Sequence, residues 1–235
     1  LYKLSTTKKI DSINSKYIYK EKKTDTKLEL IAETSENKFT TMFNKAKDLI
    51  DTKKISKIVL SRQKQYQINS SNSILSKLLQ NSEKQYPSCT TFICDFQNQG
   101  IFFSITPEKL FTLTNNEIQT VAIAGTFKSS DNLEIDHPKE LKEHHYVINY
   151  LNNTLSKFSE EILIEEKPEI IILNEIAHLK TKIKAKINNT MNAFNILYKI
   201  HPTPAVSGEP KKNSLDEITN LEDHQRGWYS GPSGW

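Results

Sequence analysis

The sequence predicts an α+β fold in which large antiparallel β-sheets are flanked by helices. Segments rich in β-branched and aromatic residues cluster over 90–123 and again over 162–187, whereas apolar residues recur at helical spacing over 37–53 and 138–158. Strands and helices therefore come in groups, and they do not alternate one by one as in folds built from parallel β-α-β units. No repeat and no shift in composition divides the 235 residues, so we expect one domain.

The N-terminal third is predicted to contain helices, a long strand and loops. Residues 1–36 are polar and rich in lysine, which favours loops with one edge strand near the apolar run 28–31. A strand is expected over 55–68 and a helix over 71–83. An amphipathic helix is expected over 37–53, because apolar side chains recur there at helical spacing; they are Phe39, Met42, Phe43, Ala46, Leu49 and Ile50.

The central and C-terminal parts are predicted to supply the main sheets. Pro138 stands where a helix begins, and the helical pattern runs to about Phe158. Two strands are expected within 162–187, on either side of Pro168, and helices near 189–200 and 214–221. Four short strands are expected earlier, with Asn, Gln and Gly between them; they cover 90–96, 101–105, 109–114 and 118–123.

The composition is that of an ordinary globular protein, with 36% hydrophobic and 26% charged residues. The net charge of +4 comes from dispersed lysines without a basic block, which argues against a nucleic-acid partner. A mildly basic protein suits a small dianionic substrate. The sequence has no run of about 18 apolar residues and no secretory leader, so we expect no membrane association. Cys89 and Cys94 should point to opposite faces of a strand and stay reduced and buried, which is typical of a cytoplasmic protein.

Six segments contain residues suited to chemistry. Two of them are punctuated by proline and glycine, and loops of this kind often position binding residues. Each of the other four also has a plain structural interpretation: an edge lysine, a surface turn carboxylate, a turn after a strand, and an exposed glutamate among lysines. The segments are Lys57-Ile58-Val59-Leu60-Ser61-Arg62, Thr106-Pro107-Glu108, Ala124-Gly125-Thr126, Lys142-Glu143-His144-His145, His201-Pro202-Thr203-Pro204-Ala205-Val206-Ser207-Gly208 and Arg226-Gly227-Trp228-Tyr229-Ser230-Gly231-Pro232-Ser233-Gly234-Trp235.

Together these segments resemble the signature of the chorismate-utilising enzymes, which include isochorismate, salicylate, anthranilate and aminodeoxychorismate synthases. The resemblance covers roughly residues 37–235 and implies the α+β fold of that family, with chorismate as the small-molecule substrate. It also implies water as the nucleophile, because members that use water carry Lys at the position of Lys57, whereas members that use ammonia typically carry Gln. Ala124 points the same way, since many aminodeoxychorismate synthases have a nucleophilic Lys there.

The same resemblance implies three catalytic roles. Lys57 is the general base and Glu108 the general acid that protonates the departing C4 hydroxyl group. Lys57 must then lose its proton near neutral pH, which requires lowering a reference pKa of ~10.4 by about three units. Glu143 is implied as a ligand of Mg²⁺, an ion that stays partly hydrated between a few carboxylates and a substrate carboxylate. The adjacent His144 and His145 do not indicate zinc, because neighbouring helix positions do not converge on one ion.

Substrate contacts are implied for residues of four segments. The Ala-Gly-Thr turn is expected to approach a substrate carboxylate with backbone and hydroxyl donors. His178 matches a His-Leu-x-Thr strand beside the substrate ring, where a structural role stays equally open. Arg226 is expected to be structural. The implied substrate-binding residues are Gly125, Thr126, His178, Thr203, Ala205, Ser207, Gly208 and Tyr229.

The expected activity is that of an isochorismate synthase, and we expect a monomer that acts in menaquinone or siderophore biosynthesis, with menaquinone preferred. Salicylate synthases usually have Thr near Ala205, so Ala205 favours an enzyme that stops at isochorismate. Two alternatives stay open: a salicylate synthase that also eliminates pyruvate, and a non-catalytic chorismate-binding fragment. Family members continue beyond Trp235 with an Arg for the pyruvyl carboxylate and a second metal-binding Glu. We therefore expect residues 1–235 to be a single chorismate-binding domain that is truncated at both ends.

Overall fold

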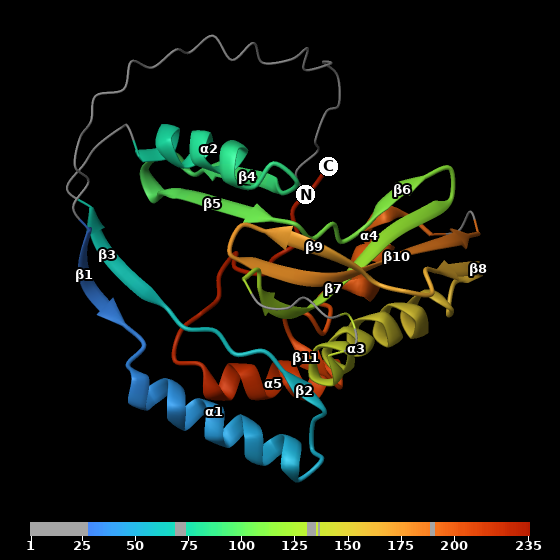
Figure 1. Cartoon of the computed structure of the whole chain (residues 1–235), viewed down its shortest axis with the longest axis horizontal. Coiled ribbons are helices and arrows are strands. Elements are labelled where there is room, and N and C mark those ends of the chain that lie inside the picture. The colour runs from blue at the N-terminus through green and yellow to red at the C-terminus, as the bar shows by residue number, and fades with distance from the viewer. Residues whose placement is uncertain (1–27, 69–73, 131–134, 136, 189–190) are drawn as a thin grey trace.

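The computed structural model describes residues 28–68, 74–130, 135, 137–188 and 191–235 (Figure 1). Every strand pair among these residues is antiparallel. In chain order the elements are β1 (Leu28–Glu33), α1 (Glu36–Asp51), β2 (Lys57–Ile58), β3 (Lys64–Ile68), α2 (Ile74–Gln85), β4 (Thr90–Asp95), a 3₁₀ turn (Gln97–Gln99), β5 (Ile101–Thr106), β6 (Thr112–Thr114), β7 (Glu117–Lys128), α3 (Pro138–Leu155), β8 (Ser159–Ile164), β9 (Glu169–Leu173), β10 (Ile176–Ile187), α4 (Ala193–Ile200), β11 (Gly208–Glu209) and α5 (Lys211–Leu221).

A five-stranded sheet forms the centre of the molecule. Its order is β6-β7-β10-β8, and β9 also pairs with β10. Alternate residues of β10 are buried, as expected for a strand with one face against a hydrophobic core. Helix α3 packs on this sheet (Figure 1), and α4 completes the core. The largest buried cluster joins these elements through Ile118, Ala122, Val147, Leu151, Leu155, Ile183, Ile196 and Ile200.

Three two-stranded units surround the central sheet. They are the ribbon β1–β3, the short pair β2–β11 and the hairpin β4–β5. All residues of β1 and β3 are exposed, and β1 pairs only with β3 among the described strands. Helix α1 begins after Ser35, whose hydroxyl group accepts a hydrogen bond from the backbone N–H of Lys38. Helices α1 and α5 lie side by side in Figure 1.

The predicted α+β class with antiparallel sheets is confirmed, but the long strand over 55–68 is wrong. This segment divides into β2 and β3 because residues 59–63 bond to distant parts of the chain and not to one continuous neighbouring strand. The N–H of Val59 donates to the carbonyl oxygen of Ser207 at 2.8 Å. The N–H of Ser61 donates to the carboxylate of Glu222 at 2.6 Å.

Other boundaries differ from the prediction in smaller ways. Residues 162–187 hold the end of β8, β9 and β10 where two strands were expected, and Pro168 lies in the connection between β8 and β9. The helix that begins at Pro138 ends at Leu155 and not at Phe158, and the strand expected from residue 109 begins at Thr112. Residues 1–27, 71–73 and 189–190 lie outside the described residues. No described helix combines the length and the apolar character that crossing a bilayer requires.

The two cysteines do not share a strand as the sequence suggested. Cys94 lies within β4, whereas Cys89 precedes that strand in a turn after α2. Both thiols are free and half-buried. The expectation that they occupy opposite faces of one strand is therefore wrong, because the strand begins only at Thr90.

Candidate active site

Lys57 lies where strand β2, helix α3 and the loop 201–208 meet. Only 9% of its side chain is exposed. Its ammonium group donates to the carbonyl oxygen of Pro204 at 2.7 Å and lies 3.4 Å from a carboxylate oxygen of Glu143. Residues from three separate parts of the sequence thus surround one amine.

Burial lowers the pKa of Lys57, although the neighbouring Glu143 carboxylate acts in the opposite direction and favours the charged form. In its neutral form the amine can still donate to Pro204, and it gains a lone pair that can accept a proton from water. The direction of this shift is the one that a general base requires near neutral pH.

Gly208 supports this lysine by allowing β11 to approach β2. A Cβ atom at Gly208 would lie 2.2 Å from the carbonyl oxygen of Lys57 and 2.6 Å from Oγ of Ser214. The hydroxyl group of Ser214 donates to that same Lys57 carbonyl at 3.0 Å. The structure therefore gives Gly208 a packing role that no larger residue could fill.

The loop 201–208 folds on itself around Thr203. The backbone N–H groups of Val206 and Ser207 each donate to the Thr203 carbonyl at 3.1 Å, and the hydroxyl group of Ser207 donates to it at 2.8 Å. Thr203 and Ser207 are both buried, and Oγ1 of Thr203 has no partner among the described residues. Ala205 is half-buried and packs against the main core cluster. The Thr203 hydroxyl group is a buried polar group of the kind that a ligand can satisfy.

Gly125 forms a bulge between β7 and β10. His178 pairs with Thr126 and the next residue of β10 pairs with Ala124, so Gly125 is the extra residue. Its φ of 79° lies in the left-handed region that favours glycine. Nδ1 of His178 lies 3.3 Å from the Gly125 carbonyl oxygen and 3.1 Å from Oγ1 of Thr126. The predicted residues Gly125, Thr126 and His178 therefore form one group.

Glu140 belongs to this group, and the sequence analysis missed it. Its carboxylate, of which 7% is exposed, accepts a hydrogen bond from the backbone N–H of Thr126 at 2.7 Å. The Thr126 amide, which was expected to serve the substrate, is therefore already bound, and the hydroxyl group of Thr126 is the donor that remains. The one signal in the sequence was the position of Glu140 three residues before Glu143, which places both on one helix face.

Helix α3 connects the two groups, because Glu140 reaches the bulge while Glu143, one turn later, faces Lys57. His144 attaches this helix to the sheet, since its Nε2 lies 2.8 Å from Oγ1 of Thr181. Burial lowers the pKa of His144 to about 4, so the ring is neutral near pH 7.

His145 has a different partner from its neighbour His144. Its Nδ1 lies 2.7 Å from the carbonyl oxygen of Leu141. The two imidazole rings thus do not converge, and no group of three potential metal ligands occurs in the described part of the chain. A partly hydrated Mg²⁺ needs fewer protein ligands. Such an ion fits beside Glu143, whose side chain is 38% exposed and can share the ion with water and substrate oxygens.

Glu108 follows directly after β5. Its backbone N–H donates to Oγ1 of Thr106 at 3.1 Å, which shapes the Thr-Pro-Glu turn. Burial raises the pKa of the Glu108 carboxyl group to about 7. A substantial share of Glu108 is therefore protonated at neutral pH, as a general acid must be. Within the described residues, no hydrogen bond or ion pair joins its carboxyl group to the Lys57 or Gly125 groups.

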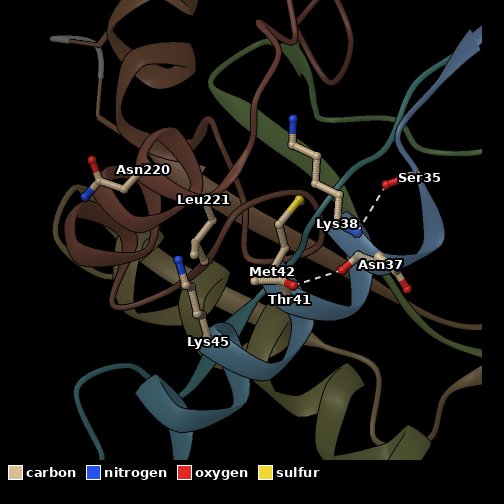
Figure 2. Close-up of a pocket in the computed structure, with 8 residues that line it drawn as sticks. All are labelled: Ser35, Asn37, Lys38, Thr41, Met42, Lys45, Asn220 and Leu221. Atoms are coloured by element: carbon tan, nitrogen blue, oxygen red, sulfur yellow. Dashed lines mark hydrogen bonds between the residues drawn. The ribbon is translucent and has the colours of Figure 1, made fainter.

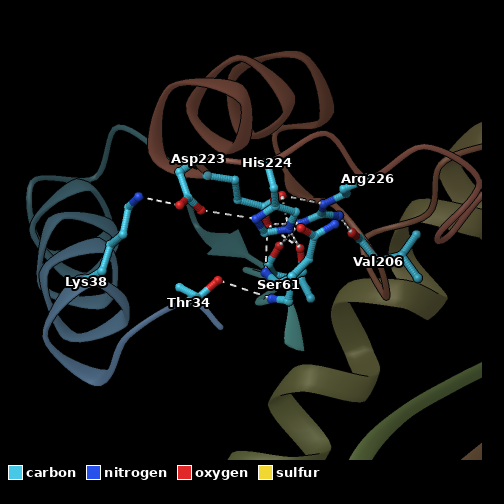
Figure 3. A network of polar contacts seen from close by, with 10 residues as sticks. Thr34, Lys38, Ser61, Val206, Asp223, His224 and Arg226 are labelled. Atoms are coloured by element: carbon cyan, nitrogen blue, oxygen red, sulfur yellow. Dashed lines mark hydrogen bonds and ion pairs between the residues drawn. The ribbon is translucent and has the colours of Figure 1, made fainter. Parts of the chain in front are cut away.

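Arg226 is the centre of a polar network (Figure 3). Its guanidinium group donates to both carboxylate oxygens of Glu222 at 2.8 and 2.6 Å, and to the carbonyl oxygens of Val206 and Val59 at 2.8 and 2.6 Å. Burial opposes ionisation of Glu222, but hydrogen bonds from Arg226 and Ser61 hold the pKa of Glu222 below its usual value. Arg226 thus holds the loop 201–208 beside the segment that follows β2, which agrees with the expected structural role.

Tyr229 lies on the surface with 56% of the residue exposed. The guanidinium carbon of Arg226 lies 5.9 Å from the centre of its ring. The adjacent Trp228 packs against Phe96 and Phe102, with ring centres 4.8 and 5.9 Å apart. Because Phe102 belongs to β5, this segment touches the hairpin that leads to Glu108. The structure does not bring Tyr229 into direct contact with Lys57 or Glu143 in the described part of the chain.

Two cavities on the described surface lie outside these groups. One, of about 420 Å³, lies between α1 and α5 (Figure 2) and is lined by Ser35, Asn37, Lys38, Thr41, Met42, Lys45, Asn220 and Leu221. The other, of about 330 Å³, lies along α3 and is lined by Tyr146, Asn149, Tyr150, Asn153, Thr154, Lys157, Glu209 and Lys211. Neither is lined by Lys57, Glu108 or Glu143, so the candidate site rests on its side chains and not on the shape of a cavity.

Two curated proteins are similar to this chain in sequence. The chain is 31% identical over 200 residues to the isochorismate synthase MenF of Haemophilus influenzae, which covers 81% of this chain and 46% of that protein. It is 30% identical over 168 residues to the salicylate biosynthesis isochorismate synthase of Pseudomonas aeruginosa, which covers 68% of this chain and 35% of that protein. The chain thus spans half or less of the length of these curated relatives.

Solved structures share the fold at lower sequence identity. The menaquinone-specific isochorismate synthase MenF of Escherichia coli superimposes with a TM-score of 0.70 at 21% identity, over 85% of this chain and 49% of that one. Component I of the anthranilate synthase of Streptococcus pneumoniae superimposes with a TM-score of 0.72 at 22% identity, over 86% of this chain and 45% of that one. Residues 2–235 match the sequence model of the family described as chorismate binding enzyme. With its antiparallel α+β fold and its buried lysine facing a helical glutamate, the chain belongs to the family of chorismate-binding enzymes.

Proposed function

We propose that this chain carries the catalytic residues of an isochorismate synthase, which converts chorismate to isochorismate. The observation that carries the proposal is the buried Lys57, whose pKa is lowered and whose amine lies between Glu143 and the loop 201–208. Glu108, with a pKa raised to about 7, supplies a matching acid. The names of the relatives support the same activity.

The reaction is a substitution with migration of the ring double bonds. Neutral Lys57 accepts a proton from a water molecule as the water oxygen forms a bond to C2 of chorismate. The ring double bonds shift, the bond between C4 and its oxygen breaks, and protonated Glu108 gives its proton to the departing hydroxyl group. One water molecule is added and one is released, so the product is an isomer. Lys57 has then gained the proton that Glu108 has lost, and exchange with solvent restores both groups.

Glu143 would hold Mg²⁺ in this scheme. When bound, the ion would orient the substrate ring carboxylate and offset its negative charge. Glu140 would keep the Gly125 bulge in place through the Thr126 amide, which leaves the Thr126 hydroxyl group and the neighbouring His178 at the edge of the site.

A salicylate synthase, which also eliminates pyruvate, is the second candidate. The name of one relative, a salicylate biosynthesis isochorismate synthase, supports this second candidate. Ala205 favours isochorismate as the end product. We propose a role in menaquinone biosynthesis, and a relative named MenF at 31% identity supports this choice. The free thiols of Cys89 and Cys94 support a cytoplasmic location.

The test is Lys57→Gln in the full-length protein, with formation of isochorismate, salicylate and pyruvate from chorismate followed by chromatography. We expect turnover to fall on the order of 10²-fold or more, because Gln cannot accept the proton of water. Lys54→Gln, at an exposed position on the approach to β2, is the control and should keep normal turnover. Retention of more than about a tenth of the activity in Lys57→Gln would contradict the assigned base.

The products decide among the candidate functions. Isochorismate alone supports the proposal, whereas salicylate and pyruvate support the second candidate. If the wild-type protein converts no chorismate but binds it in a calorimetric titration, a non-catalytic chorismate-binding role replaces both.

A further inference from the structure

Three carbonyl oxygens of the loop 201–208 are each bound by a cationic side chain from a different part of the chain. Lys57 and Arg226 bind two of them, as described above. The third cation is Lys211, the first residue of α5, whose ammonium group donates to the carbonyl oxygen of His201. The proposed reaction gives no role to Lys211.

Lys211 also connects this loop to α3 through Tyr150. Its Nζ donates to Oη of Tyr150 at 3.3 Å and lies 5.9 Å from the centre of the ring. Tyr150 in turn donates to the carbonyl oxygen of Ile200 at 2.9 Å, the shorter of its two contacts with the end of α4. Burial raises the pKa of Tyr150 to about 12, so the phenol keeps the proton that this bond needs. Because a phenol has a single proton, Tyr150 is the acceptor in its bond with Lys211.

These bonds join the helix that carries Glu143 to the loop that carries four of the predicted substrate contacts. Tyr150 follows Glu143 by about two turns, or ~10 Å along the helix axis, so Lys211 acts away from the proposed reacting atoms. The hydrogen bonds of the loop to the Thr203 carbonyl are internal. They fix the shape of the loop but not its place against α3.

We propose that Lys211 is a positioning residue, whose ammonium group holds the loop 201–208 against α3 and so sets the substrate contacts beside Glu143. The effect on the substrate rests on the proposed function. The effect on the loop can be measured without substrate.

The first measurement is amide hydrogen exchange of the loop in three variants. Lys211→Met keeps the apolar stem and removes the ammonium group, Lys211→Arg keeps charge and donors, and Lys212→Met changes the exposed neighbour on the same helix. We expect exchange of the Val206 and Ser207 amides to accelerate on the order of tenfold in Lys211→Met, to stay near wild type in Lys211→Arg, and to be unchanged in Lys212→Met. Unchanged exchange in Lys211→Met would overturn the proposal.

The second measurement is steady-state kinetics with chorismate. Lys211→Met should raise KM on the order of tenfold with a smaller change in kcat, because the substrate contacts are displaced while the proposed base and acid remain. Lys211→Arg should restore most of the loss. Lower thermal stability together with unchanged KM and kcat would overturn the positioning role and leave a purely structural one.

Tyr150→Phe tests whether the two residues act together. If Lys211 acts through Tyr150, the double variant should raise KM no more than Lys211→Met alone. Additive effects would show that the two residues act independently and would overturn the link.

Failure of the proposed function and failure of the positioning role of Lys211 give different results. A wild-type protein without isochorismate formation overturns the proposed function, and hydrogen exchange then decides whether Lys211 holds the loop.

Discussion

At the residue scale, burial shifts the pKa values of Lys57 and Glu108 toward each other. Removal from water penalises the charged form of each group, so the pKa of the lysine falls and that of the carboxyl group rises to about 7. Burial thus shifts each group toward its neutral form, which is the reactive form of a base or an acid. Titratable groups with pKa values shifted by burial in this way are often found at functional sites.

The raised pKa of Glu108 predicts how activity depends on pH. The value of kcat/KM should fall as pH rises through about 7, because Glu108 then loses the proton that it must donate. A profile from about pH 5.5 to about pH 9 measures this limb. Glu108→Gln should lower kcat/KM on the order of 10²-fold or more and abolish the limb. Activity that stays level across pH 7 in the wild type would contradict Glu108 as the acid.

The same pKa predicts part of the pH dependence of stability. The folded protein keeps the Glu108 proton to about pH 7, whereas the unfolded chain loses it near the ordinary value of 4.5. The folded state binds more protons in this window, so the contribution of Glu108 to the free energy of unfolding falls as pH rises from 4.5 to about 7. Glu108→Gln should remove this slope in urea unfolding at successive pH values, and an identical slope in the variant would contradict the shifted pKa.

Glu143→Ala should make activity unresponsive to Mg²⁺, because the carboxylate proposed to hold the ion is absent. Initial rates across a Mg²⁺ series measure this, and calorimetric titration with Mg²⁺ gives a readout that does not depend on turnover. Glu166→Ala, at an exposed position, is the matched control. Titration curves that coincide for wild type and Glu143→Ala would remove Glu143 from the metal site.

At the scale of elements, the Glu222–Arg226 pair joins the end of α5 to the segment that follows β2 and to the loop 201–208 (Figure 3). Only 2% of the Glu222 side chain and 17% of the Arg226 side chain are exposed. A buried charge pair of this kind is sensitive to loss of one partner, because the other charge is left without compensation.

Glu222→Gln should therefore lower the free energy of unfolding by about 2–3 kcal/mol, since the variant leaves Arg226 with a neutral partner. For a chain of this size the thermal midpoint should fall by roughly 4–12 °C. Glu217→Gln, within α5, is the control, and differential scanning calorimetry is the measurement. Equal midpoints for the two variants would show that the network does not stabilise the fold.

At the scale of the whole molecule, the hydrophobic core is concentrated between the central sheet, α3 and α4. The β1–β3 ribbon contributes no buried residue, and α2 buries only Ser82. Local stability follows the number of buried apolar contacts, so these parts of the molecule should open at different free energies.

Native-state hydrogen exchange should therefore show the slowest exchange in β7 and β10 and the fastest among the strands in β1 and β3. Mass spectrometry of peptic peptides can resolve these strands, and the β4–β5 hairpin should be intermediate because Trp228 packs on it. Amides of β1 that exchange as slowly as those of β10 would show that the ribbon shares the stability of the core.

The sequence by itself determined the α+β class, most of the helices and the family. These features depend on local patterns: apolar spacing gives α1 and α3, Pro138 marks the first turn of α3, and short motifs place Lys57, Glu108 and Glu143. The pairing of Lys57 with Glu143 was not predicted, but the resemblance assigned both residues to one site. Only the structure shows that they lie 3.4 Å apart.

Tertiary structure alone decided where the long strand breaks, which partner Glu140 binds and what Lys211 holds. The strand breaks because Val59 and Ser61 bond to residues more than 140 positions away. Glu140 binds an amide of another element, and Lys211 joins a helix to a loop. Hydrogen bonds of this kind depend on which segments the folded chain brings together, and no local spacing of residues encodes that choice.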